Sequence, residues 1–195
     1  NGSFRLADNF TVTGPSWNVE SISFYAYQTN AGVFTFTGAT WSVLAGTDVN
    51  SGTVVASGTS AVTNGGLMGY RVTPTTLTST ARAIYRITAD MPDFTLAAGN
   101  YFLVWSLAGS SGSGPFVPPV LGSLGSGNAL QGPTAGSLTT LVDSGSNLTV
   151  ELPFTINGSV AAVPEPASWA MMLIGFGGVA GALRARRRKT SVVAA

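Results

Sequence analysis

A run of seventeen uncharged residues near the C-terminus, residues 167–183, is the feature that most restricts what this 195-residue chain can fold into. As an α-helix the run would be about 25 Å long, slightly shorter than the roughly 30 Å hydrocarbon core of a bilayer. Trp169 suits one membrane interface, and Arg184 can extend its guanidinium toward the other. A helix buried in a soluble core has the same length but little reason to end in Arg-Ala-Arg-Arg-Arg-Lys. We therefore predict a single C-terminal transmembrane helix over residues 167–183.

The charges divide the chain into an acidic part and a basic part. Residues 1–163 carry four arginines against seven acidic residues, a net charge of −3, whereas residues 164–195 carry five basic residues against one glutamate, a net charge of +4. An acidic body with one basic cluster argues against a nucleic-acid groove. The excess of positive charge on the cytoplasmic side of membrane helices places the cluster in the cytoplasm and residues 1–163 outside. The basic residues that would stop translocation are Arg184, Arg186, Arg187, Arg188 and Lys189.

A short proline-rich stretch, Pro164-Glu165-Pro166, stands immediately before the uncharged run. Two prolines so close together give a stiff, extended backbone with few hydrogen-bond donors, and a proline also suits the first turn of a helix. An ordinary linker would explain the prolines alone. The ordered series PEPASWAMMLIGFGGVAGALRARRRK is far more specific than its first three letters.

This series resembles the PEP-CTERM sorting signal, in the variant with Trp-Ala after the motif that occurs in many secreted proteins of Gram-negative bacteria. The matching residues are Pro164, Glu165, Pro166, Trp169 and Ala170, then the apolar segment from Met171 to Gly178 and the basic residues from Arg184 to Arg188. The short tail at residues 190–195 departs from the pattern, because such signals usually end at the basic residues. The resemblance implies a precursor held in the inner membrane, processed near the PEP motif by an exosortase, and delivered to the cell surface or extracellular matrix, as in biofilms. Since Asn1 is not an initiator methionine, we also expect an export signal peptide upstream.

The rest of the chain alternates apolar and polar residues in short segments that are separated by glycine-rich turns, which is typical of β-strands. We expect strands within residues 17–27, 40–44, 52–56, 69–72, 82–87, 101–107 and 148–156, with Pro153 marking an edge or a bulge. Turns are expected at residues 14–15 and 97–100, among others. This pattern predicts an all-β, antiparallel sandwich of jelly-roll type over residues 1–160, a sorting signal over residues 161–189 and a short tail over residues 190–195. The body also resembles a recurrent exported domain to which no activity is assigned.

A long segment without periodicity, residues 109–137, interrupts these strands. Such loops are uncommon in compact domains and are usually functional or mobile. Phe116, Val117 and Val120 are apolar, so they must either pack against a sheet or remain exposed. We expect them to fold back onto the sheet.

Composition excludes several kinds of chemistry. The chain has no cysteine and no histidine, and its only lysine is Lys189, so disulfides, zinc held by those residues and histidine-activated nucleophiles are ruled out. Asp90 and Asp93 could offer oxygen ligands to calcium, but they more simply form a turn around Met91 and Pro92. We expect no cofactor and no enzymatic activity.

Three functions fit these observations. The first is a non-enzymatic surface or matrix protein sorted by its tail, with the exosortase as its processing partner. The alternative is a module that binds exopolysaccharide, with Trp105 and Phe116 as the candidate sugar contacts because they lie in the charge-free half of the body. Aromatic residues at alternate strand positions more often belong to the core, so a competing interpretation places Trp105 there. An unusual hydrolase is the third, and it would need two carboxylates about 5–10 Å apart in a cleft.

Overall fold

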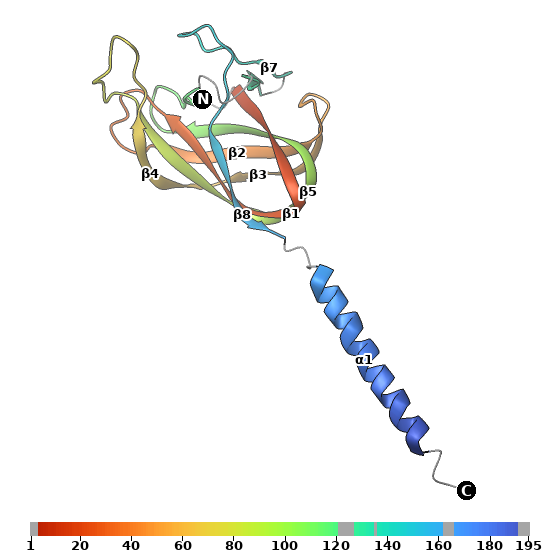
Figure 1. Ribbon diagram of the computed structural model, residues 1–195. Helices are drawn as coiled ribbons and strands as arrows, with labels where there is room; N and C mark the ends of the chain where they lie inside the picture. The colour runs from red at the N-terminus through yellow and green to blue at the C-terminus, as the bar shows by residue number, and fades with distance from the viewer. Residues whose placement is uncertain (1–3, 121–126, 135, 162–165, 191–195) are drawn as a thin grey trace. The chain divides into compact units, whose positions relative to one another are not determined.

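The protein divides into two compact units, Asn1–Ala161 and Ala162–Ala195. The computed structural model describes residues 4–120, 127–134, 136–161 and 166–190. The first unit consists of β-strands, and the second contains one helix (Figure 1). The elements are β1 (Phe4–Tyr27), β2 (Phe36–Ala45), β3 (Thr53–Ser60), β4 (Val62–Tyr70), β5 (Ala83–Gly109), β6 (Leu130–Pro133), β7 (Thr139–Thr140), β8 (Phe154–Val160) and α1 (Pro166–Thr190).

Two very long strands, β1 and β5, organise the first unit. They pair antiparallel along almost their whole length, from Leu6 opposite Trp105 to Tyr27 opposite Ile84. The end of β5 also pairs with β2, which carries β3, and the start of β1 pairs with β6, which carries β7. The other halves of the two strands are flanked by β4, on β5, and β8, on β1. Each long strand therefore belongs to both layers of the fold (Figure 1), and the prediction of an antiparallel all-β domain is confirmed.

The two turns expected inside these strands are wrong. Gly14 and Pro15 lie in β1, where the register with β5 shifts between Val12 and Ser16. Gly14 has a φ of +80°, which glycine adopts readily, and Pro15 has no N–H to leave unpaired. Residues 97–100 likewise lie within β5. Glycine and proline here interrupt the register of a strand without ending it, so the chain passes from one layer to the other.

The core lies between the two layers and is rich in aromatic rings. Trp105 on β5 contacts Phe24 on β1 and Phe154 on β8, with ring centroids 5.6 and 5.9 Å apart. Trp41 on β2 stacks on Phe94 of β5, with centroids 5.7 Å apart. Aromatic pairs at these separations add to the stability that their buried area provides. The alternation of inward apolar side chains along β2 and β5 produces this core.

The last strand of the body is shorter than the sequence indicated. It was expected from residue 148, whereas β8 begins at Phe154, immediately after Pro153. Proline cannot donate a hydrogen bond to a neighbouring strand, which explains this boundary. Among the described strands β8 pairs only with β1, so the expected edge position is confirmed.

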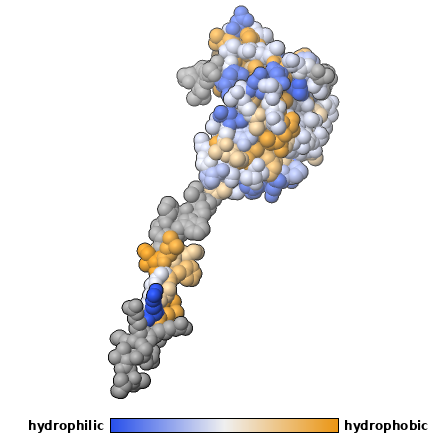
Figure 2. All heavy atoms as spheres, turned by 90° about the vertical axis from the view of Figure 1, so that its right-hand side faces the viewer, coloured by the Kyte–Doolittle hydropathy of each residue, from blue (hydrophilic) through white to orange (hydrophobic). Residues whose placement is uncertain are grey.

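The helix α1 runs from Pro166 to Thr190, a length of 25 residues. Its described apolar side chains, between Met171 and Leu183, are exposed and give the helix a largely apolar surface (Figure 2). Within the portion of the chain that the structure describes, no helix is sufficiently long and apolar to cross a membrane. The predicted C-terminal helix is confirmed, over residues 166–190 instead of 167–183, whereas its crossing of a membrane stays a prediction.

Candidate functional site

The residues of the C-terminal signal occupy one continuous segment. Pro166 is the first residue of α1, where a proline costs no helical hydrogen bond because the first N–H groups of a helix are unpaired. Trp169 and Ala170 follow in the first turns, whereas Pro164 and Glu165 lie outside the described residues. The basic cluster Arg184, Arg186, Arg187, Arg188 and Lys189 occupies the C-terminal end of the helix, where positive charge is favourable because of the helix dipole.

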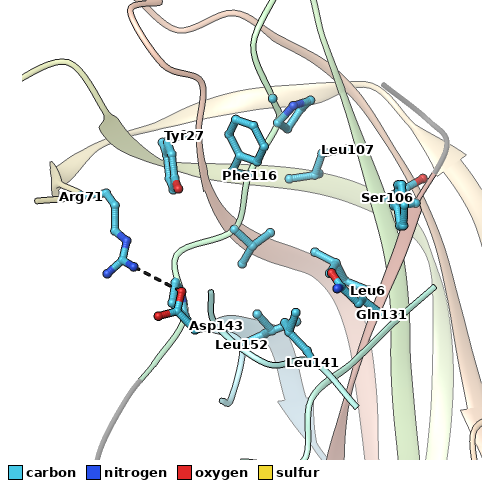
Figure 3. Close-up of a pocket in the computed structure, with 15 residues that line it drawn as sticks. Leu6, Tyr27, Arg71, Ser106, Leu107, Phe116, Gln131, Leu141, Asp143 and Leu152 are labelled. Atoms are coloured by element: carbon cyan, nitrogen blue, oxygen red, sulfur yellow. Dashed lines mark hydrogen bonds and ion pairs between the residues drawn. The ribbon is translucent and has the colours of Figure 1, made fainter. Parts of the chain in front are cut away.

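The body contains a cavity of about 520 Å³ near the start of β1 and the end of β5 (Figure 3). Most of its wall is apolar and comes from Leu6 on β1, Leu107 on β5, and the segments around Leu141 and Leu152. This volume is within the range of ligand pockets, which are generally apolar with a few polar groups. The cavity is therefore the first candidate binding site of the body.

Phe116 lies at this cavity, on the long segment that connects β5 to β6. Its backbone pairs with that of Tyr27 through two hydrogen bonds of 2.8 and 2.9 Å, and the two rings are 5.6 Å apart and tilted by 39°. Val120 pairs in the same way with Glu151, and Val117 packs against the core. The expectation that this part of the segment folds back is confirmed, but Phe116 remains 46% exposed.

Trp105, unlike Phe116, is buried. Its side chain is only 1% exposed and packs between the two layers. A sugar stacks on a free ring face, and Trp105 offers none to solvent. The prediction that Trp105 contacts a ligand is therefore wrong, because an inward position on β5 made this tryptophan part of the core.

One side of the cavity is charged. Arg71 forms an ion pair of 3.5 Å with Asp143 (Figure 3). Asp143 is also held by its own turn, because its Oδ2 accepts hydrogen bonds of 2.9 Å from the backbone N–H and the hydroxyl of Ser146. The pair therefore places one fixed carboxylate and one guanidinium beside an apolar wall.

The sequence did not reveal a pair of neighbouring acidic side chains, the buried Asp8 and the half-buried Glu151. Asp8 is 3% exposed, and its oxygens accept hydrogen bonds from the backbone N–H groups of Leu152 (2.7 Å) and Asn9 (2.8 Å). Burial, together with the negative charge of Glu151, raises the pKa of Asp8 to about 7. The alternation of Leu6, Asp8 and Phe10 along β1 was the available signal, because it places Asp8 on the same inward face as two apolar residues.

The hydrogen bonds of Asp8 and Glu151 indicate a structural role for both carboxyl groups. Both oxygens of Asp8 are taken up by backbone groups, and Oε1 of Glu151 accepts the backbone N–H groups of Gly127 and Asn128 at 3.1 and 3.3 Å. The pair thus holds β1 against two later segments of the chain. Asp90 and Asp93 lie within β5, so the turn expected around Met91 and Pro92 is also wrong. Among the described residues no three His, Cys, Asp or Glu side chains come together as a metal site.

The comparison with known families matches residues 162–189 to a PEP-CTERM protein-sorting motif. The tail is thus similar to PEP-CTERM sorting motifs. The match covers the whole series from the PEP residues to the basic cluster, as the sequence indicated, and it implies an exosortase as the processing enzyme. It also implies an exported precursor that is anchored in the membrane before it is processed. No curated protein and no solved structure shows significant similarity to the chain.

Proposed function

We propose that this protein is a non-enzymatic component of the cell surface or extracellular matrix, delivered by its PEP-CTERM motif. The observation that carries the proposal is the position of the motif, which begins at residue 162, directly after the compact β-unit ends at Ala161. Removal of the tail would therefore leave the strands and the core of the body intact. A sorting signal that is separate from the structure it delivers is suited to being cut away.

The chemistry of the tail supports a simple division of roles. The apolar surface of α1 holds the precursor in the inner membrane, and the basic cluster stays on the cytoplasmic side. Proline on both sides of Glu165 favours an extended backbone, which is the conformation that a processing enzyme can bind along its length. In this proposal the chain is the substrate of the exosortase.

Mass spectrometry of the mature protein from the native host tests this function. We expect a C-terminus near residues 163–166 and the complete absence of residues 184–189. A variant in which Arg184, Arg186, Arg187, Arg188 and Lys189 are all replaced by serine should be released unprocessed, because the stop to translocation is lost. Recovery of intact wild-type chain from washed cell surfaces would show instead that the tail is a permanent anchor.

A second candidate function is the binding of a neutral exopolysaccharide at the cavity beside Phe116. The half-exposed ring of Phe116, held in place by its pairing with Tyr27, supports it. A fixed aromatic face next to an apolar wall can stack against the apolar face of a sugar ring. The binding experiment that tests this function compares Phe116→Ala with the wild-type protein and is described below.

A further inference from the structure

The outer face of the layer formed by β3, β2 and β5 carries a row of hydroxyl groups. In the strand register, Thr40 on β2 lies opposite Thr59 on β3 and Ser106 on β5, and Ser42 lies opposite Ser57. Side chains that are directly opposite one another project from the same face of a sheet. Trp41 and Val43, which alternate with these residues, are buried in the core, so the hydroxyl groups face away from it.

These hydroxyl groups line a groove. Two neighbouring hollows with cavity volumes of about 490 and 410 Å³ share Arg5, Ser42 and Val104, so they form one continuous depression across the sheet. Its far wall is the turn between β6 and β7, which Asn50 fixes by two hydrogen bonds to the backbone of Leu138. We call this depression the hydroxyl groove and define it by Arg5, Thr40, Ser42, Ser57, Thr59 and Ser106.

Arg5 is the only charged residue among the described residues that line the hydroxyl groove. One of its terminal nitrogens donates a hydrogen bond of 2.7 Å to the carbonyl oxygen of Gly136, which fixes the side chain at the wall. Its Nε is buried and has no hydrogen-bond partner among the residues that the structure describes. No ion pair to Arg5 occurs in that same part of the chain. A ligand cannot reach the buried Nε, but the other terminal nitrogen makes no hydrogen bond to a described residue, so the guanidinium has N–H donors left for an acceptor that enters the groove.

We propose that the hydroxyl groove binds an acidic polysaccharide through its carboxylate-bearing sugar units. A carboxylate is the acceptor that a guanidinium binds best, and the surrounding serine and threonine hydroxyls can exchange hydrogen bonds with sugar hydroxyls. One cation surrounded by several neutral hydroxyls suits a ligand with many hydroxyl groups per negative charge, as a uronate has. The residues that line the groove and the hydrogen bonds of Arg5 support this binding site independently of the proposed function. Only the role of the site in the extracellular matrix rests on the proposed function.

The residues of the groove explain why the sequence did not reveal this site. They come from four strands, of which β1 and β5 are distant in the sequence from β2 and β3, and all of them except Arg5 are small polar residues at outward strand positions. Arg5 precedes the first predicted strand, so it had no assigned neighbours at all. The strand register alone brings it beside Ser106 and the turn after β6.

Titration calorimetry on the full chain in a non-ionic detergent tests the proposal, with oligogalacturonate as the probe and its methyl ester as the neutral counterpart. We expect the acid to bind and the ester to bind at least about tenfold more weakly, because the charge-assisted hydrogen bonds to Arg5 are lost. Arg5→Gln should weaken binding of the acid by a similar factor. The matched control is Arg82→Gln, which removes an arginine that does not line the groove and should leave binding unchanged.

A second variant separates binding from folding. Ser42→Leu fills the floor of the groove without removing Arg5, and it should abolish binding while the melting temperature remains close to that of the wild type. Equal binding of acid and ester, unchanged binding in both variants, or equally tight binding of inorganic phosphate would overturn the proposal. Because the titration does not depend on processing, its failure leaves the sorting function intact, and a failure of processing in the host leaves this site intact.

Discussion

The body and the tail of this protein hold their functional information in different ways. The tail is understood from the order of its residues, because a proline motif, an apolar segment and a basic cluster follow one another within residues 162–189. The body shows no such series, and its candidate sites assemble from strands that lie far apart in the sequence. A processing enzyme that acts on an extended segment needs only local sequence, whereas a ligand that binds to a folded surface needs the fold. Substitutions in the tail should therefore leave the stability and ligand binding of the body unchanged, and substitutions in the body should leave the processing of the tail unchanged.

The largest expected effect concerns the tail. Replacing Pro164, Glu165 and Pro166 together by alanine should abolish processing, because both the recognised residues and the extended backbone are lost. Mass spectrometry in the host would then find only chains that retain the basic cluster. The unfolding free energy of the body should stay within about 0.5 kcal/mol of the wild-type value, as for surface changes far from the core. Normal processing of this variant would place recognition elsewhere in the chain.

The next effect concerns the core of the body. Trp105→Ala removes a side chain that is 1% exposed and contacts both Phe24 and Phe154. Truncation of such a buried aromatic residue costs about 3–5 kcal/mol, a large part of the stability of a small domain. Denaturant unfolding of the full chain in detergent would measure it, with the exposed Leu67→Ala as the matched control. A loss below about 1 kcal/mol would contradict the position of Trp105 in the core.

The contrast between the two regions also explains what the sequence could predict. The almost continuous apolar run over residues 101–107 was sufficient to predict a strand, and the absence of helical periodicity was sufficient to predict an all-β body. The passage of β1 and β5 between the layers was not predictable, because Gly14 and Pro15 are equally typical of a turn and of a bulge. Whether an aromatic residue is core or surface depends on which face of the strand is covered, so the sequence left open whether Trp105 contacts a ligand or lies in the core.

A smaller effect follows from the buried carboxyl of Asp8. Its pKa is about 7 in the folded protein and near 4 in an unfolded chain, so between these pH values the folded state holds more protons than the unfolded state. The free energy of unfolding should therefore be highest below about pH 4 and fall as the pH rises to about 7, by an amount on the order of 3–4 kcal/mol.

Asp8→Asn should flatten this part of the pH profile, because the amide does not titrate. Urea unfolding at several pH values between 4 and 8 would measure both proteins. Asp48→Asn, which alters an exposed carboxylate, is the control and should retain the wild-type slope. Parallel profiles for the wild type and Asp8→Asn would show that another group causes the pH dependence.

Only a small effect on stability is expected from Phe116→Ala, and this variant decides whether the cavity of the body binds a neutral sugar. Because the ring is 46% exposed and contacts mainly Tyr27, its removal should cost less than about 1 kcal/mol. Retention on the host's neutral exopolysaccharide should nevertheless fall, since the stacking face is lost. The control, Leu77→Ala, removes a more exposed apolar side chain from a different segment and should change neither property.

Melting temperature and retention together separate the two roles of this residue. Lower retention at an unchanged melting temperature would show that Phe116 contacts the sugar, whereas a lower melting temperature with unchanged retention would make it a packing residue that closes the cavity. Absence of retention by the wild-type protein would end the neutral-sugar hypothesis and leave the hydroxyl groove as the saccharide site to test. The backbone pairing of residue 116 with Tyr27 does not depend on the side chain, so the segment should keep its position in the variant. Any change in retention can then be assigned to the ring itself.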